Sequence, residues 1–178
     1  MPVSRVLLVV AAVVVALGFV STQPWGDQSR DRSTDRPTAP RRATPPAERA
    51  VVVRVVDGDT LVVKVGGAAE RVRVLGIDTP EVDPAECGAD RATAQARRLL
   101  PAGATVRLVG DRSQADRDRY DRLLRYVERG GRDVGRLLVA RGWARVFVFQ
   151  GHPFDRTDDY RSAERAARGA HRGAWHAC

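Results

Sequence analysis

The sequence predicts an α+β protein built on a five-stranded Greek-key β-barrel of the OB type, with about three helices. Two observations lead to this prediction. Five short runs rich in β-branched residues follow one another after residue 50, and tight-turn signals join the first three. One helix-patterned segment separates the third run from the fourth. A small barrel closes its sheet around a core, which suits a folded region of this size.

The first three strands are predicted to form a meander. The Asp57-Gly58-Asp59 turn separates the first two, and Gly66-Gly67 separates the second from the third. In the third strand Arg71 and Arg73 alternate with valines, so both arginines lie on one face of the sheet. The three runs span residues 51–56, 61–65 and 71–75.

The second half of the barrel follows a predicted helix. Residues 89–100 are rich in Ala, Arg and Leu, and Pro101 and Gly103 end the helical pattern. A fourth strand is expected at 105–109, then a charged loop at 110–120 and a fifth strand at 123–127.

Two further helices are predicted near the C-terminus. Asp133 is expected to cap a short helix whose apolar residues begin at Val134. Residues 146–149 form a short β run, and either Asp158 or Asp159 is expected to cap the last helix. The inward side of that helix is predicted to consist of Tyr160, Ala163, Ala166 and Ala167.

The N-terminus has the pattern of a secretory signal. Arg5 precedes an apolar run over residues 6–20, shorter than the roughly 20 residues that a membrane-spanning helix needs. Because no clear Ala-x-Ala cleavage site is present, an uncleaved anchor remains the alternative. Residues 1–22 are therefore assigned to a signal peptide or N-terminal anchor, and the rest of the chain is expected to be extracellular or at the cell surface.

A linker separates this segment from the folded domain. Residues 23–49 are rich in Pro, Arg, Ser and Thr and contain almost no large apolar residues, so they are predicted to be disordered. The domain itself is expected at 50–178.

Export changes the interpretation of the two cysteines. Outside the cytosol, Cys87 and Cys178 are candidates for a disulfide, although two unpaired thiols remain possible. The bridge would close a loop of about 90 residues, worth roughly 4–5 kcal/mol in the chain-entropy model.

The chain is strongly basic, with a formal net charge of +8 and a pI near 10.8. This charge suits a polyanionic partner such as nucleic acid or an anionic surface. The alternative is arginine-rich coding, because Lys64 is the only lysine in the chain.

Carboxylates and arginines recur at the ends of the predicted strands. They lie in Asp57-Gly58-Asp59-Thr60, in the segment from Arg73 to Glu81, and in Arg119-Tyr120-Asp121-Arg122. Each motif alone is compatible with an ordinary turn or a solvated strand residue. Together they supply oxygen ligands for a hard cation, a carboxylate that can handle a proton of water, and guanidinium groups that bind phosphate.

The order and spacing of these motifs resemble the staphylococcal nuclease (thermonuclease) family. The family pattern is a D-G-D-T turn, an R-x4-D-T-P-E segment and a later Y-x-R-x-L run. Here these stand at 57–60, 73–81 and 120–124, and the resemblance extends from about Val51 to Trp175.

The resemblance implies a role for each matching residue. Asp59, Asp78 and the backbone carbonyl of Thr79 would bind Ca²⁺, with Asp57 as an outer carboxylate. Glu81 would deprotonate the attacking water, and Arg73 and Arg122 would bind the phosphate. The residues that would contact the remaining substrate are Arg119, Tyr120, Phe147 and Phe149.

The chain departs from the family pattern at two places. Position 121 is Asp where the family usually has Gly, and positions 147 and 149 are Phe where Tyr is typical. Asp tolerates a left-handed backbone better than most residues, but its charge beside Arg122 could weaken phosphate binding. Phenylalanine keeps the aromatic ring and loses the hydroxyl hydrogen bond.

The resemblance therefore implies a Ca²⁺-dependent nuclease that hydrolyses DNA and RNA with little base specificity and leaves 3′-phosphate ends. The alternative is a non-catalytic OB module that binds nucleic acid at the cell surface. No protein partner is implied, a monomer is expected, and membrane contact would come only through an uncleaved N-terminal segment.

Overall fold

The computed structural model of the chain describes residues 47–178. The predicted signal or anchor at 1–22 and nearly all of the predicted linker lie outside the described residues. The first strand begins at Glu48, two residues before the predicted start of the domain at 50. Glu48 and Arg49 belong to the strand because they pair with Leu108 and Arg107. No helix within 47–178 is long and apolar enough to cross a lipid bilayer.

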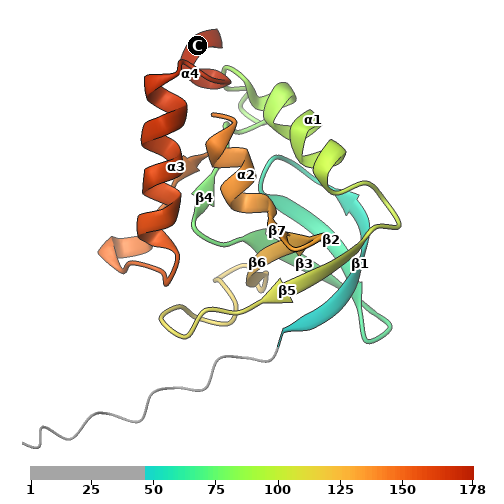
Figure 1. Cartoon of the computed structure of the whole chain (residues 1–178). Coiled ribbons are helices and arrows are strands. Elements are labelled where there is room, and N and C mark those ends of the chain that lie inside the picture. Colours follow the sequence, from blue (N-terminus) through green and yellow to red (C-terminus); the bar gives the residue numbers. More distant parts are fainter. Residues whose placement is uncertain (1–46) are drawn as a thin grey trace, which may run out of the picture. The chain divides into compact units, whose positions relative to one another are not determined.

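The predicted five-stranded barrel is confirmed (Figure 1). Its strands are hydrogen-bonded in the order β3-β2-β1-β5-β6, and a parallel pairing of β3 with β6 closes the sheet. The barrel consists of β1 (Glu48–Val55), β2 (Thr60–Val65), β3 (Ala68–Val74), β5 (Thr105–Val109) and β6 (Leu123–Arg129).

The meander of β1, β2 and β3 is antiparallel, as the turn signals predict. Barrel closure places Val72 of β3 opposite Leu123 of β6, and Arg73 opposite Leu124. The inward side chains of these strands are almost fully buried, including Val52, Leu61 and Val72. Two very short strands were not predicted from the sequence as separate elements: β4 (Ile77–Asp78) and β7 (Arg132–Asp133). A third, β8 (Arg145–Val146), corresponds to the predicted β run at 146–149.

Helices cover one end of the barrel (Figure 1). Asp133 caps α2 as predicted, because its carboxylate accepts a hydrogen bond of 3.1 Å from the backbone N–H of Arg136. The same carboxylate accepts a hydrogen bond of 2.8 Å from the hydroxyl of Tyr160, which ties α2 to α3. The helices are α1 (Ala89–Leu99), α2 (Val134–Ala140), α3 (Thr157–Gly169) and α4 (Ala174–Ala177).

The predicted start of α3 is wrong. The helix begins at Thr157, so Asp158 and Asp159 lie in its first turn and neither is the cap. The Thr157 hydroxyl closes the entry turn, accepting from the N–H of Phe154 at 2.9 Å and donating to the carbonyl of the same residue at 2.6 Å. Asp159 instead pairs with Arg136.

Two other local predictions also need correction. Ala166 is exposed, and the buried side of α3 consists of Thr157, Tyr160, Ala163 and Ala167. The β run predicted at 146–149 ends at Val146, and a 3-10 turn, η1 (Phe149–Gly151), follows. The run stops early because its partner β4 contains only two residues.

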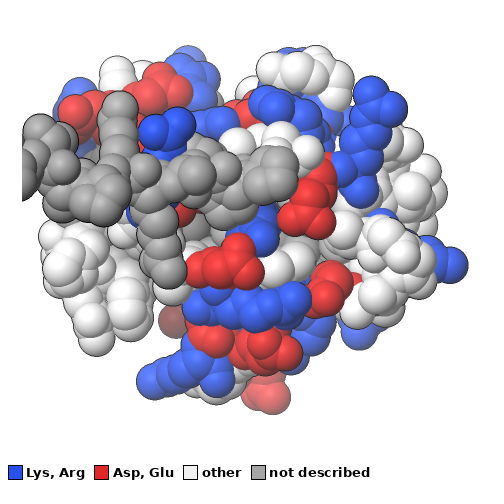
Figure 2. Space-filling view, turned by 90° about the horizontal axis from the view of Figure 1, so that it is seen from below, with Lys and Arg blue, Asp and Glu red and all other residues white. Residues whose placement is uncertain are grey.

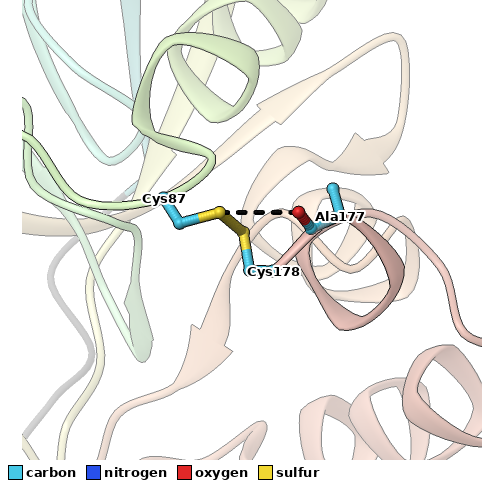
Figure 3. Close-up of a disulfide and its surroundings, with 3 residues drawn as sticks. All are labelled: Cys87, Ala177 and Cys178. Atoms are coloured by element: carbon cyan, nitrogen blue, oxygen red, sulfur yellow. Dashed lines mark hydrogen bonds between the residues drawn. A yellow bond between two sulfur atoms is a disulfide. The ribbon is translucent and has the colours of Figure 1, made fainter.

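A disulfide joins Cys87 to Cys178 (Figure 3). It connects the loop before α1 to the last residue of the chain, 91 positions later. The sulfur of Cys87 also lies 3.6 Å from the backbone carbonyl oxygen of Ala177 in α4. The bridge therefore holds the C-terminus against the segment that follows Glu81.

Loss of this disulfide should destabilise the domain. The bridge closes a loop of 91 residues and so restricts the unfolded chain. In the chain-entropy model this restriction raises the free energy of unfolding by up to roughly 4–5 kcal/mol. A reductant should therefore lower the urea concentration at which the protein unfolds. The chain carrying Cys87→Ser and Cys178→Ser is the control, and its unfolding should not respond to reductant. Equal midpoints for the oxidised and reduced native chain would contradict the stabilising role.

Candidate active site

Asp59, the residue directly before β2, is a buried carboxylate with only 6% of its surface exposed. Its Oδ2 accepts hydrogen bonds of 2.9 Å from both the backbone N–H and the hydroxyl of Thr79. Its Oδ1 lies 3.1 Å from Nε of Arg73. Burial raises the pKa of Asp59 to about 6; Arg73 opposes the shift and the nearby Asp57 adds to it.

The turn before Asp59 is packed against Thr79. The Asp57 carboxylate accepts hydrogen bonds from the backbone N–H groups of Asp59 (3.0 Å) and Thr60 (2.6 Å), which fixes the turn. A Cβ atom on Gly58 would lie 2.6 Å from the Thr79 hydroxyl oxygen. Gly58 is therefore required for close packing between two segments about twenty residues apart. Sequence analysis identified the turn but not this contact.

Arg73 brings two carboxylates together. Its Nε faces Asp59, and its Nη2 lies 2.9 Å from Oδ1 of Asp78. Its Nη1 donates to the carbonyls of Val74 (3.0 Å) and Ile77 (2.6 Å). The Arg73 side chain is 14% exposed and that of Asp78 is 51% exposed, so the cluster reaches solvent at Asp78.

Arg122, the residue directly before β6, approaches the same cluster. Its Nη1 lies 3.4 Å from the hydroxyl of Thr60, and that hydroxyl donates a hydrogen bond of 3.2 Å to Oδ1 of Asp59. Thr60 is also the register partner of Arg73 across β2 and β3. The two predicted phosphate-binding arginines therefore meet at one Asp59–Thr60 unit.

Asp118 orients Arg122, a role that sequence analysis missed. Its carboxylate accepts from the backbone N–H of Tyr120 (2.9 Å) and of Arg122 (3.0 Å), and from Nε of Arg122 (2.7 Å). Burial would raise the pKa of Asp118, but these hydrogen bonds outweigh it and lower the pKa below its usual value. An Asp side chain that accepts hydrogen bonds from backbone N–H groups two and four residues later is typical of a turn, so this role of Asp118 could have been recognised from the sequence.

Tyr120 lies at the surface beside two arginines. Its ring is 58% exposed, and the guanidinium carbons of Arg119 and Arg122 lie 4.7 and 5.3 Å from the ring centroid. Arg119 also donates a hydrogen bond of 2.6 Å to the Tyr120 hydroxyl. This arrangement presents positive charge and an aromatic ring next to Arg122.

Asp121 has the left-handed backbone that its position requires, with φ 60°. Its carboxylate points to Arg117, at 3.6 Å, and its backbone carbonyl accepts a hydrogen bond of 2.9 Å from the same guanidinium. Across residues 47–178, Arg117 is the ion-pair partner of Asp121, and Arg122 pairs with Asp118.

Glu81 lies in the loop after β4, three residues beyond Asp78. Its backbone N–H donates to the carboxylate of Glu86 at 3.1 Å, and its carbonyl accepts from the N–H of Glu86 at 2.9 Å. Its own side chain is exposed and has no ion-pair partner within the described chain. The carboxylate is therefore open to water.

Phe147 and Phe149 form an exposed aromatic pair. Their side chains are 45% and 58% exposed, and their ring centroids lie 6.4 Å apart. The N–H of Phe147 donates a hydrogen bond of 3.0 Å to the carbonyl of Gly76, in the turn that leads to Asp78. The pair therefore lies beside the chain segment that carries the candidate ligands.

The donor set is compatible with a hard cation. Three carboxylates, on Asp57, Asp59 and Asp78, lie around the guanidinium of Arg73, and the charge of Arg122 is paired with a fourth carboxylate, Asp118, so negative charge is in local excess. Oxygen donors of this kind suit Ca²⁺. Within residues 47–178, no three side chains of His, Cys, Asp or Glu are arranged to hold a metal ion by themselves. A cation here would also need the Thr79 carbonyl and water.

Elsewhere, acidic and basic side chains are interspersed. Figure 2 shows both signs side by side on the face seen from below. Ion pairs such as Arg117 with Glu70 and Arg125 with Asp116 illustrate the same mixing. The net positive charge therefore does not form one uniform basic surface on this face.

Known proteins with similar sequences agree with the fold and the candidate site described above. Residues 71–177 match the family model described as staphylococcal nuclease homologue. The chain is 35% identical to the SPbeta prophage-derived endonuclease YokF of Bacillus subtilis (strain 168), over 68% of this chain and 42% of that protein. It is 34% identical to the Thermonuclease of Staphylococcus hyicus, over 56% of this chain and 59% of that protein.

A second Bacillus subtilis protein, Endonuclease YncB, is 34% identical over 68% of this chain and 59% of its own length. The chain spans about half the length of these relatives. The family model covers more than half of the chain, and the closed barrel agrees with it. The chain belongs to the staphylococcal nuclease homologue family.

Proposed function

We propose that this protein is a Ca²⁺-dependent phosphodiesterase that hydrolyses DNA and RNA outside the cytosol. One observation carries the proposal: Arg73 of β3 and Arg122, the residue directly before β6, meet at the Asp59–Thr60 unit beside Asp78. The names of the relatives, endonuclease and thermonuclease, support the same chemistry.

Asp59, Asp78 and the Thr79 carbonyl are the residues that would hold the cation. When bound, Ca²⁺ neutralises a non-bridging phosphate oxygen and orients a water molecule. The phosphate itself would be bound by Arg73 and Arg122, whose planar guanidinium groups match its oxygens and stay charged throughout the reaction. Contacts made to phosphate carry little sequence information, so weak base specificity follows.

Glu81 is the proposed general base. Its carboxylate is exposed and unpaired, so it can accept a proton from the attacking water. Phe147 and Phe149 offer an exposed aromatic surface on which a base can stack. Tyr120 and Arg119 are suited to a neighbouring phosphate, because they add positive charge and hydrogen-bond donors next to Arg122. The products would carry 3′-phosphate ends, and the protein would act as a monomer.

Removal of Ca²⁺ tests this function. The full chain is incubated with plasmid DNA and with single-stranded DNA, in Ca²⁺ and in EGTA. Cutting is expected in Ca²⁺, should stop in EGTA, and should return when Ca²⁺ is restored. DNA binding is measured in parallel by fluorescence anisotropy. A folded protein that binds DNA but never cuts it would instead support a non-catalytic binding module.

The substitution Asp121→Gly should leave nuclease activity unchanged or raise it by a few-fold. Glycine adopts the left-handed backbone at position 121 without strain, and its introduction removes a negative charge close to the phosphate-binding arginines. Initial rates on single-stranded DNA at low salt measure the effect. A collapse in activity with an unchanged melting temperature would mean that this Asp has a role of its own, through Arg117.

A further inference from the structure

Three arginines form a stripe on the outer side of α3. Arg161, Arg165 and Arg168 are spaced four and three residues apart, so they share one face of the helix. All three side chains are exposed, and the buried face of α3 lies elsewhere, at Tyr160, Ala163 and Ala167. At 1.5 Å per residue the stripe is about 10 Å long. Figure 1 shows α3 along an outer edge of the domain, with α4 across its C-terminal end.

The stripe takes part in no ion pair within the described residues. Neither Arg161 nor Arg165 has an ion-pair partner within the described residues, whereas Arg73 and Arg122 are both paired with aspartates. Two of the three acids on α3 are engaged elsewhere: Asp159 pairs with Arg136, and Glu164 accepts a hydrogen bond of 2.8 Å from the N–H of Val146. The third, Asp158, lies in the first turn, ahead of the stripe.

A continuous chain of contacts links the stripe to the candidate active site. Asp78 is the register partner of Arg145 in the short β4–β8 sheet. The guanidinium of Arg145 lies 5.1 Å from the Trp175 ring, and that of Arg168 lies 5.4 Å from the same ring. Trp175 therefore connects the edge of the site to the start of the stripe.

A cavity of about 390 Å³ occupies the same region. Its lining includes Asp78 and Thr79 from the candidate site, and Trp143, Arg145 and Trp175 from the C-terminal part of the domain. The space beside the candidate ligands thus opens toward Arg145 and Trp175. A polymeric substrate that leaves the site on this side meets arginines and an aromatic ring.

We propose that Arg145, Trp175 and the stripe of Arg161, Arg165 and Arg168 form a second binding surface for single-stranded polynucleotide, the α3 track. The inference rests on the proposed function, because the strand bound there would be the continuation of the strand held at Arg73 and Arg122. Unpaired guanidinium groups beside an aromatic ring bind a phosphate backbone and its bases without sequence preference. The track makes long polynucleotides better substrates than dinucleotides.

The test removes the three charges from α3 and compares an equal change on another helix. The track variant of the full chain carries Arg161→Gln, Arg165→Gln and Arg168→Gln. The control carries Arg91→Gln, Arg97→Gln and Arg98→Gln, three exposed arginines on α1. Binding of a fluorescent single-stranded 20-mer is measured in EGTA over a range of salt concentrations, so that cleavage is not needed.

The track variant should bind the 20-mer at least about tenfold more weakly at low salt. Each lost phosphate contact reduces the slope of log K against log salt by about 0.7, so the slope should fall by about 2. The control should change both quantities by less than half as much. Equal losses in the two variants would mean general attraction only and would overturn the track.

Cleavage provides a second, independent result. In Ca²⁺ the track variant should cut a dinucleotide at the native rate and a 20-mer with a KM raised about tenfold. If no variant cuts any substrate but the slopes differ as expected, the proposed function fails and the track remains. If cutting is normal and the slopes agree, the track alone is overturned.

Two further measurements keep the result unambiguous. The melting temperature of each variant checks that it is folded. If the triple variant fails to fold, it is replaced by the double variant Arg161→Gln/Arg165→Gln, which leaves the Arg168–Trp175 contact intact. Flotation with phosphatidylglycerol vesicles tests the other anionic partner. Loss of vesicle binding with unchanged affinity for the 20-mer would make this surface a membrane contact and refute the proposal.

Discussion

The substitution Glu81→Gln should lower the turnover number by about 10²- to 10⁴-fold, the range expected when a general base is removed. Glutamine has nearly the same shape as glutamate but cannot accept the proton of the attacking water. The Glu81 side chain is exposed and forms no ion pair in the described chain, so the folded structure should be unaffected. Affinity for single-stranded DNA should stay within about twofold of the native value. The measurement is the initial rate at saturating Ca²⁺ and DNA.

Glu86→Gln is the matched control for this variant. Glu86 lies in the same loop, is exposed, and uses an oxygen to accept the N–H of Glu81, which glutamine can also do. The two variants therefore make the same chemical change five residues apart. If both lowered turnover equally, the loop charge rather than a base at 81 would explain the effect. Near-native turnover of Glu81→Gln would remove Glu81 from the mechanism.

The substitution Arg73→Lys should reduce activity by about 10²- to 10³-fold although it keeps the positive charge. The Arg73 guanidinium contacts Asp59, Asp78 and two backbone carbonyls at once. A lysine ammonium is a single point of charge and cannot reproduce this fork, either toward the carboxylates or toward phosphate. Activity on single-stranded DNA and the Ca²⁺ concentration at half-maximal rate are both measured.

These two readouts separate the possible roles of Arg73. If it mainly aligns Asp59 with Asp78, the variant should need more Ca²⁺, and high Ca²⁺ should restore much of the rate. If it mainly binds phosphate, the rate should stay low at every Ca²⁺ concentration. Arg71→Lys, on the same face of β3 and exposed, is the control and should behave as the native chain. Native activity of Arg73→Lys would refute both roles.

Much of the barrel could be predicted from local sequence because its strands carry strong local signals. The strand at 105–109 has the predicted bounds, and Asp133 caps α2 through its own side chain and the next turn. The start of α3 was missed because the choice among Asp158, Asp159 and Thr157 depends on tertiary contacts. Arg136, on a different helix, pairs with Asp159, and Thr157 forms the turn instead.

In the candidate site, too, local motifs could be predicted from the sequence and tertiary contacts could not. Motifs identified the charged residues, because each stands in a short segment of recognisable pattern. They did not identify Thr60 as the link between Arg122 and Asp59, since that contact joins positions 62 residues apart. Nor did they reveal that Gly58 must be small to pack against Thr79. Such roles arise only when the strands pair, so a single sequence does not display them.

The parallel pairing of β3 with β6 has a consequence for when activity can appear during synthesis. Val72 and Leu123 are 51 positions apart, and all of Asp59, Arg73, Asp78 and Glu81 precede β6. Long-range pairing of this kind forms late, because the intervening chain must first give up its conformational entropy. A ribosome-bound chain or proteolytic fragment ending before β6 would carry all five candidate side chains, including Arg122 directly before the strand, without a closed barrel to align them. Alignment of the candidate site is thus a property of the finished domain, and an incomplete chain should not achieve it.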